Sequence, residues 1–472
     1  MAGAAAFTAL ALTALTACSG SAVTGKPGDA GVRDPYFPKL GNGGYDVAHY
    51  GLKVDYDPES KKLAGEAEIT ARATQDLSAF NLDLKGLNVD KVTVEGKPAR
   101  FNRAAHELTV RPDDDLRKGE TFKATVRYSG KPETITDADD STEGWLYTAD
   151  GAIGLGEPTG SMAWFPANNH PSDKAAYDIE ITVPKGLTAV SNGELKETRP
   201  GKNGRSTFVW HNAEPMASYL AMAAIGKYEV KKSDVKLKAG RLPVYTAVDP
   251  TRAEESEEVL AVIPDVMKWG EDNFGAYPFS STGAVVERDD DIGYHLETQT
   301  KPVFDGSPDE STLVHELAHQ WFGDSVTPKS WQDMWLNEGL ATYAEWLWEE
   351  DTYGDYSAQD IFDQIYAGKG DALEEFEIDP EALWEFPPAK PTNAKAISGD
   401  PVYNRGAMVI HKIRQAVGDD KFYDIIQGWT KKYRHSNANT ADFTAYVEEK
   451  AGKKLDSIWG PWLYGNGKPK KP

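Results

Sequence analysis

The residues best suited to chemistry lie in one short stretch, where His315, Glu316 and His319 form an H-E-x-x-H motif. Side chains four positions apart lie on the same face of an α-helix, so both imidazoles can bind one metal ion from the same side. Glu316 is then directed past the ion, where it can hold a metal-bound water. Two histidines leave a zinc ion short of ligands, because a catalytic zinc site needs a third protein ligand and one open position.

Glu338 is the candidate third ligand, because it follows His319 by 19 residues. That separation allows one helix to end, a loop to turn and the first turn of a second helix to return to the metal. We expect the first helix to run from an N-cap at Ser307 to about Phe322, and the second to begin at Asn337 or just before it. A surface helix with two solvated histidines is the alternative to a zinc site.

The sequences HELAHQWFGDSVTP and WLNEGLATY resemble the gluzincin aminopeptidases, the family that includes aminopeptidase N and leukotriene hydrolase. The resemblance covers most of the chain. It implies one zinc ion per chain bound by His315, His319 and Glu338, with Glu316 as the general base. It also implies peptide substrates and a thermolysin-like, mainly helical catalytic domain. Many relatives continue into a helical C-terminal domain, so we expect two main domains and a more open cleft here.

Two further residues have roles that only the resemblance implies. Tyr403, in the phrase DPVYNRGAMV, would stabilise the oxyanion of the tetrahedral intermediate, whereas Arg405 in the same phrase is expected to be structural. Glu157, in GEPTGSMAWFP, would reach from the N-terminal domain to the free α-ammonium of the substrate. Metal-bound histidines also need an acceptor for the second ring nitrogen, and Thr342, one turn after Glu338, is a candidate partner for a metal ligand.

The segment YHLET corresponds to the family's Gly-Ala-Met-Glu-Asn exopeptidase segment, which lies as an edge strand beside the cleft. Glu297 keeps the glutamate that binds the free amine of the substrate. Thr298 replaces the usual asparagine, while Tyr294 and His295 replace the glycine and alanine. We expect His295 to be a pocket or surface residue. The substitutions leave strict aminopeptidase selectivity open, so a zinc endopeptidase is an alternative.

The chain divides into segments of different pattern, which predict an α+β multidomain fold. Residues 45–235 contain short alternating strands separated by Gly, Pro and Asp turns, which indicate an antiparallel β domain. Residues 236–466 have helical periodicity and form the predicted catalytic domain, followed by a tail at 467–472. His106 and Glu107 begin a second H-E pair, but Val110 and a strand-like setting exclude another H-E-x-x-H helix.

The N-terminus predicts export. Residues 1–17 are mostly small and apolar and are typical of a signal segment. Leu15-Thr16-Ala17-Cys18 resembles a bacterial lipobox, so Cys18 is expected to carry a lipid, and residues 18–44 to form a flexible tether. These features predict a protein on the extracellular face of a bacterial membrane, lipid-anchored through Cys18 or secreted. Cys18 is the only cysteine, which excludes an internal disulfide.

Net charge narrows the set of partners. The chain has 51 Lys and Arg against 74 Asp and Glu, a net charge of −23, which repels phosphate backbones and argues against nucleic acid. No strongly apolar run of membrane-spanning length follows the signal segment. The oligomeric state is left open, and we expect a monomer.

The leading hypothesis is a zinc aminopeptidase. The alternatives are an open-cleft endopeptidase and a surface lipoprotein that binds without catalysis.

Overall fold

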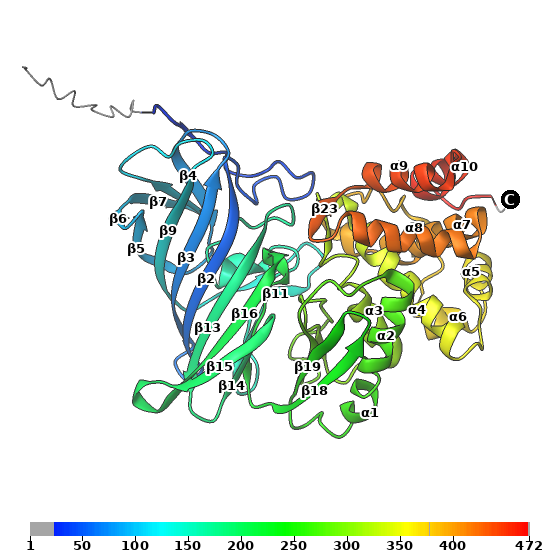
Figure 1. Cartoon of the computed structure of the whole chain (residues 1–472), viewed down its shortest axis with the longest axis horizontal. Helices are drawn as coiled ribbons and strands as arrows, with labels where there is room; N and C mark the ends of the chain where they lie inside the picture. The colour runs from blue at the N-terminus through cyan, green and yellow to red at the C-terminus, as the bar shows by residue number, and fades with distance from the viewer. Residues whose placement is uncertain (1–22, 377, 471–472) are drawn as a thin grey trace, which may run out of the picture.

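The computed structural model describes residues 23–376 and 378–470, and it has a β-rich N-terminal half beside a mainly helical C-terminal half (Figure 1). The predicted α+β multidomain fold is therefore confirmed. The signal segment and Cys18 lie outside the described residues. None of the described helices is long and apolar enough to cross a membrane.

The N-terminal half is built on an eight-stranded sheet that is antiparallel except where β13 pairs with β2. Its strands in spatial order are β15 (Glu194–Pro200), β16 (Arg205–Ala217), β13 (Lys174–Pro184), β2 (Tyr45–Asp57), β3 (Lys62–Ala73), β9 (Thr121–Gly130), β5 (Asn88–Val94) and β6 (Lys97–Pro98). Alternate side chains of β13 are buried, as expected for a strand with one face on the core. Tyr50 and Tyr177 stack across β2 and β13, with ring centroids 4.9 Å apart.

Two smaller sheets complete this half. One contains β10 (Thr134–Thr136), β11 (Thr142–Leu146), β12 (Ala152–Leu155), β17 (Ala223–Gly226) and β14 (Thr188–Ser191). The other contains β1 (Lys26–Pro27), β4 (Leu77–Asp83), β8 (Glu107–Arg111) and β7 (Arg100–Ala104), with β1 parallel to β4. The domain is thus antiparallel, as predicted, apart from two parallel pairs.

Residues 23–44 are not a flexible tether in the structure, although their Gly, Ser, Pro and Asp content predicts one. They pack on the β domain through β1 and reach the catalytic half. Asp34 is 4% exposed and accepts hydrogen bonds from the Ser330 hydroxyl (2.7 Å) and the Trp331 amide (3.0 Å). Gly31 has φ 93° and lies against a neighbouring carbonyl, so this glycine makes a tight packed turn rather than a flexible link.

The boundary between the two domains lies earlier in the chain than the predicted 235/236. β18 (Glu229–Leu237) and β19 (Gly240–Val248) form a hairpin, and β19 continues in parallel to β20 (Thr282–Glu287) and β21 (Val303–Asp305). A boundary at 235/236 would cut β18 in two. The β domain therefore ends between β17 and β18, because the alternating pattern of β18 belongs to the sheet of the catalytic half.

Helices make up most of the rest of the C-terminal half (Figure 1). They are α1 (Ser256–Leu260), α2 (Ile263–Phe274), α3 (Glu310–Ala318), α4 (Trp335–Thr352), α5 (Ala358–Ala367), α6 (Ala372–Glu375), α7 (Gly406–Val417), α8 (Asp419–Lys432), α9 (Thr440–Ala451) and α10 (Asp456–Ile458). The short helical turns are η1 (Gly160–Ala163), η2 (Lys202–Gly204), η3 (Ser218–Leu220), η4 (Trp331–Asp333), η5 (Ala382–Trp384), η6 (Ala394–Ser398), η7 (Pro401–Arg405) and η8 (Trp459–Leu463). Outside these, β22 (Val326–Pro328) pairs in parallel with β23 (Ser436–Ala438).

Helices α4 and α7 cross at a pair of glycines. A Cβ on Gly339 would lie 2.8 Å from the backbone of Gly406, which is closer than real Cβ contacts, so only glycine allows this approach. The crossing brings η7, which directly precedes α7, against the first turns of α4. This crossing positions Tyr403 of η7 close to the metal-ligand candidate Glu338.

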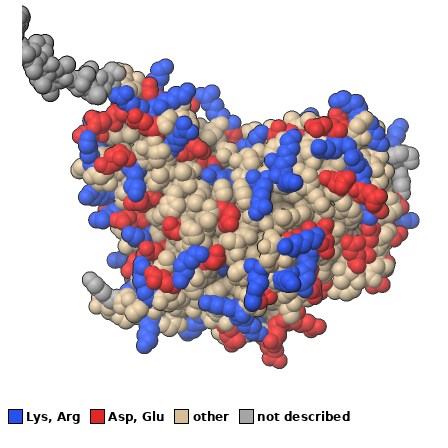
Figure 2. All heavy atoms as spheres, in the orientation of Figure 1, with Lys and Arg blue, Asp and Glu red and all other residues tan. Residues whose placement is uncertain are grey.

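The surface carries both signs of charge. Figure 2 shows Lys and Arg interspersed with Asp and Glu over the visible face, without a continuous basic surface there.

At the C-terminal end, the hydroxyl of Tyr366 donates to the carbonyl of Pro469 at 2.8 Å. The predicted tail at 467–472 is therefore packed on α5 over its described part.

Candidate active site

Helix α3 carries the H-E-x-x-H motif, and both of its ends differ from the prediction. Asp309, not Ser307, is the N-cap, because its carboxylate accepts from the Thr312 amide at 2.7 Å. The helix ends at Ala318 with His319 as its C-cap, several residues before Phe322. The chain leaves α3 through wider turns, with the Asp324 amide donating to the carbonyl of His319 at 3.0 Å.

The three predicted metal ligands meet at one point. Nε2 of His315 and Nε2 of His319 each lie 3.3 Å from Oε2 of Glu338. All three side chains are buried or nearly so. Helix α4 begins at Trp335, just before Asn337 as predicted, and this places Glu338 in its first turn.

The other ring nitrogens of both histidines are held in place. Nδ1 of His315 lies 2.5 Å from Oε1 of Glu345, and Nδ1 of His319 lies 2.9 Å from the carbonyl oxygen of Phe322. Both acceptors favour a proton on Nδ1, which leaves the Nε2 atom of each ring, on the Glu338 side, to bind a metal ion. Thr342 does not have this role, because its buried hydroxyl makes no hydrogen bond. No sequence motif singles out Glu345, although it lies two turns after Glu338 on the same helix.

Three more carboxylates crowd around this point. Glu297 and Glu316 each have a donor atom within 4.8 Å of His319, and Glu157 and Glu297 lie equally close to Glu338. One carboxylate oxygen of Glu297 and one of Glu316 are buried without a hydrogen-bond partner. The structure therefore brings together every carboxylate predicted for the site, with unpaired oxygens that need a cation or a donor.

Burial and charge shift the pKa values of these groups. Burial raises the pKa of Glu316 to about 8, against the opposing effect of His315 and His319. Burial and the charges of Glu297 and Glu338 raise the pKa of Glu157 well above its usual value. Burial would also raise the pKa of Glu338, but the two imidazoles outweigh it and hold that pKa at about 2. Without a bound cation, the site therefore favours an ionised Glu338 beside protonated Glu157 and Glu316.

The exopeptidase segment is not an edge strand, contrary to the prediction. Leu296 makes a single antiparallel bridge to Val303, and the strand that follows is β21. The chain turns tightly instead, because the hydroxyl of Thr298, at the place of the usual asparagine, donates to the Lys301 carbonyl at 2.5 Å. The Gln320 side chain donates to the carbonyl of Glu297 at 3.3 Å, which ties this turn to the residues after α3.

Three neighbouring residues either lie beside the metal-ligand candidates or have structural contacts. The ring of Tyr403 stacks on that of His315, with centroids 6.1 Å apart and planes 15° apart. Nδ1 of His295 accepts from the Asp305 amide at 3.2 Å, so this histidine is not among the metal-binding groups. The guanidinium of Arg405 is buried and donates to the backbone carbonyls of Trp462, Pro461, Phe386 and Gly465.

The donor set fits zinc. Two imidazole nitrogens and one carboxylate oxygen, with each outer ring nitrogen held by an acceptor, are the ligand types of catalytic zinc sites. The unpaired oxygens of Glu297 and Glu316 lie beside the three ligands rather than among them. Three protein ligands leave a fourth position for water or substrate.

Both halves of the chain match models of one peptidase family. The Peptidase M1 N-terminal domain matches residues 47–220, and the Peptidase family M1 domain matches residues 278–462. The chain belongs to peptidase family M1. The resemblance to the gluzincin aminopeptidases is thereby confirmed.

Solved structures in the family are similar over the whole fold. The M1 zinc metallopeptidase from Deinococcus radiodurans, as a mutant bound to a Tyr-Ser-Ala substrate, is 28% identical with a TM-score of 0.84. The match covers 93% of this chain and all of that chain. An aminopeptidase A from Legionella pneumophila has a TM-score of 0.76 at 19% identity, which shows the shared fold. Zinc, named for the Deinococcus structures, is thus the metal of this family's centre.

Curated relatives are longer. The chain is 26% identical over 443 residues to the probable aminopeptidase 2 of Sulfurisphaera tokodaii, a match that covers 90% of this chain and 54% of that protein. It is 27% identical over 468 residues to the glutamyl aminopeptidase of Bos taurus, covering 89% of this chain and 46% of that protein. The chain therefore spans about half the length of the curated relatives it matches.

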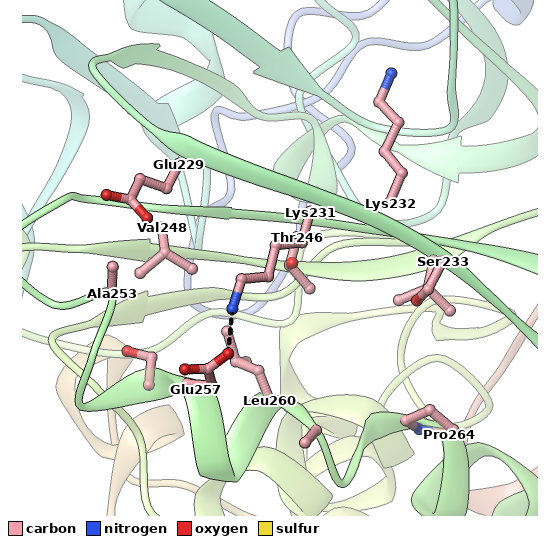
Figure 3. Close-up of a pocket in the computed structure, with 13 residues that line it drawn as sticks. Glu229, Lys231, Lys232, Ser233, Thr246, Val248, Ala253, Glu257, Leu260 and Pro264 are labelled. Carbon is pink, nitrogen blue, oxygen red and sulfur yellow. Dashed lines mark hydrogen bonds and ion pairs between the residues drawn. The ribbon is translucent and has the colours of Figure 1, made fainter.

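A separate hollow of about 570 Å³ lies away from the metal-ligand candidates, between β18, β19 and α1 (Figure 3). Lys231 and Glu257 face each other across it, with Nζ and Oε1 2.7 Å apart. Its other lining combines aliphatic side chains with the polar Ser233, Ser256 and Thr246 and the charged Glu229 and Lys232. It shares no residue with the candidate active site.

Proposed function

We propose that this protein is a zinc-dependent aminopeptidase that removes single residues from the N-termini of peptides. The observation that carries the proposal is the position of Glu297 and Glu157 beside the zinc ligands, within 4.8 Å of a carboxylate oxygen of Glu338. Two carboxylates in that place bind an α-ammonium group. An ammonium held so close to the metal leaves room for one residue before the bond to be cleaved.

Electrostatics favour the same assignment. Crowded buried carboxylates repel one another, and burial raises the pKa of Glu297 above its usual value. A substrate ammonium and a zinc ion supply the missing positive charge from two sides. Binding of a free N-terminus therefore relieves a repulsion that a blocked N-terminus leaves in place, which gives selectivity for free amines.

His315, His319 and Glu338 would hold the zinc ion, which when bound lowers the pKa of water and polarises the scissile carbonyl. Glu316 takes the proton of the attacking water and passes it to the leaving amine. Burial makes the Glu316 carboxylate more basic, and positive charge nearby keeps it ionised before the reaction. Its oxygen without a hydrogen-bond partner is available to accept the proton. The exclusion of solvent around Glu316, which is 7% exposed, strengthens each of these interactions.

Tyr403 stabilises the negative charge that develops on the carbonyl oxygen. Its ring stacks on that of His315, and the charges of Glu338, Glu157 and Glu297 act on its hydroxyl, which supports a position facing the cluster. Burial and these charges hold the pKa of Tyr403 well above 10, so the hydroxyl stays protonated and donates a hydrogen bond. A donor of this kind typically lowers the barrier by about 2.7–4 kcal/mol.

The alternatives predict different behaviour. An endopeptidase would cleave internal bonds and would gain nothing from the carboxylates of Glu297 and Glu157. A binding protein without catalysis would not need Glu316 and Tyr403 at the zinc ligands. Export and a lipid on Cys18 remain proposals that rest on the N-terminal sequence, and mass spectrometry of the mature protein from a bacterial membrane would test them.

Aminoacyl-fluorophores with free and acetylated amines test the proposal directly. We expect cleavage of the free-amine set alone, abolished by a zinc chelator and restored by zinc. Glu297→Gln should lower kcat/KM for free-amine substrates by about 10–100-fold, as expected for one lost hydrogen bond to a charged group. Glu287→Gln, at another buried glutamate of the same half, is the matched control. Cleavage of acetylated substrates at equal rates would instead assign an endopeptidase.

A further inference from the structure

A second group of potential ligands, which shares no residue with the active site, lies in the sheet formed by β1, β4, β8 and β7. Asp83 ends β4 and Glu107 begins β8, and the two residues are direct partners across the antiparallel ladder. His106 directly precedes Glu107. Like charges directly opposite each other on a ladder destabilise it, so this pair needs a reason to exist.

One oxygen of Asp83 is satisfied and the other is not. Asp83 is fully buried, and its Oδ2 accepts from the amide of Gly41 (3.1 Å), the side chain of Asn42 (3.0 Å) and the amide of Asn169 (3.0 Å). Its Oδ1 is buried without a hydrogen-bond partner. Three donors fix the direction of this carboxylate, so Oδ1 points to a definite place.

Other donor atoms converge on the same place. One oxygen of Glu107 is also buried without a partner, and Nε2 of His106 lies 3.7 Å from Oδ1 of Asp83. The same Nε2 donates a hydrogen bond to the carbonyl oxygen of Lys39 at 3.1 Å, and a cation bound at Nε2 would replace that proton. One donor atom from each of Asp83, His106 and Glu107 lies within 4.8 Å of the other two. Burial and the charge of Glu107 hold the pKa of Asp83 well above its usual value, as expected for two unneutralised carboxyls.

We propose that Asp83, His106 and Glu107 bind a divalent cation of the zinc or manganese class, with the carbonyl of Lys39 beside them. One imidazole nitrogen with two carboxylate oxygens suits these ions, whereas calcium and magnesium prefer oxygen alone. The cation replaces the repulsion across the ladder with two attractions. His106 is about one-fifth exposed, so an ion can enter from solvent on that side.

The proposed ion is structural. It joins the strand pair β4–β8 to the segment that carries Lys39, Gly41 and Asn42. A few residues earlier, the same segment carries Asp34, whose carboxylate contacts Ser330 and Trp331 of the catalytic half. A cation at Asp83 therefore fixes the base of an arm that spans the two halves.

Metal content of the zinc-loaded full chain tests the site. The probes are Zn²⁺ and Mn²⁺ alone, and the measurements are elemental analysis after dialysis and Tm during Mn²⁺ titration. We expect more than one cation per chain, a saturable rise in Tm, and loss of both in Asp83→Asn and Glu107→Gln. Glu68→Gln, an exposed carboxylate of the same half, is the matched control and should keep both. His319→Ala should lose the active-site zinc but keep the second cation.

Two results would overturn the proposal. One is a single cation per wild-type chain with either metal, which would show that a proton shared by Asp83 and Glu107 relieves their repulsion. The other is a second cation that Asp83→Asn and Glu107→Gln retain as well as Glu68→Gln does. If Asp83→Asn fails to fold, the half-buried Glu107→Gln variant decides, because that substitution changes one atom at a less enclosed position.

Discussion

Replacement of Glu345 should weaken zinc binding, although Glu345 is not a zinc ligand. Its Oε1 lies 2.5 Å from Nδ1 of His315, and its Oε2 accepts from the hydroxyl of Ser311 at 3.0 Å. Ser311 belongs to α3 and Glu345 to α4, so the carboxylate is fixed by both helices that carry the ligands. It keeps the proton of His315 on Nδ1 and the Nε2 lone pair directed at the metal position.

The size of the effect follows from what each variant keeps. Loss of such a partner typically costs 10–100-fold in metal affinity, or about 1.4–2.7 kcal/mol. Glu345→Ala removes the acceptor and should show the full loss. Glu345→Gln retains a neutral acceptor, and a neutral hydrogen bond is about half as strong as a charged one, so its loss should be intermediate.

Zinc affinity is measured by competition with a chelator, read as metal content and as peptidase rate at saturating zinc. Glu349→Gln is the matched control, because it lies one turn further along α4 and contacts the Tyr356 amide instead of a ligand. Glu345→Ala with an affinity within twofold of both wild type and Glu349→Gln would refute the reasoning. The stacking of Tyr403 on His315 would then be sufficient to orient the ring.

Three further outcomes follow from the same geometry. Glu316→Gln should lower kcat by about 10²–10⁴-fold with zinc content unchanged, and loss of zinc along with activity would contradict a general-base role. Tyr403→Phe should lower kcat by about 10²–10³-fold with little change in KM, whereas a change confined to KM would place the hydroxyl on the substrate ground state. His411 is buried, and burial together with Arg414 and Lys412 lowers its pKa to about 3. The unfolded chain therefore binds an extra proton below pH 6.5, so the free energy of unfolding should fall on acidification, by at most about 1.4 kcal/mol per pH unit. His411→Gln should show a smaller difference between urea unfolding at pH 7 and pH 5, and an unchanged difference would refute the assignment.

Local spacing was sufficient to predict the metal-ligand candidates. His315 and His319 share a helix face by backbone geometry alone, and Glu338 needs only a helix that returns to them. Tyr403, Glu297 and Glu157 could not be found in this way, because their positions depend on long-range packing that leaves no local pattern. Only the resemblance to a family singled them out.

The predictions from sequence that the structure contradicts failed for physical reasons. Ser307 with a glutamate three positions later fits a capping box, but the carboxylate of Asp309 is an equally good cap and lies closer to the free amides of α3. The tether prediction failed because Gly and Pro make packed turns as readily as flexible links. Glu345 did leave a signal, seven residues after Glu338, but one acidic residue among 74 is not informative without the His315 ring beside it.

The position of Tyr403, the proposed oxyanion donor, depends on residues that have no chemical role of their own. Glu338 and Tyr403 are far apart in sequence, and they meet because α4 and α7 cross at Gly339 and Gly406. Side chains on either glycine would separate the helices and move η7 relative to His315. The zinc ligands need only two helices that share one ion, whereas the alignment of Tyr403 needs a third element at a fixed distance. The two glycines are therefore required to hold Tyr403 where its proposed role needs it.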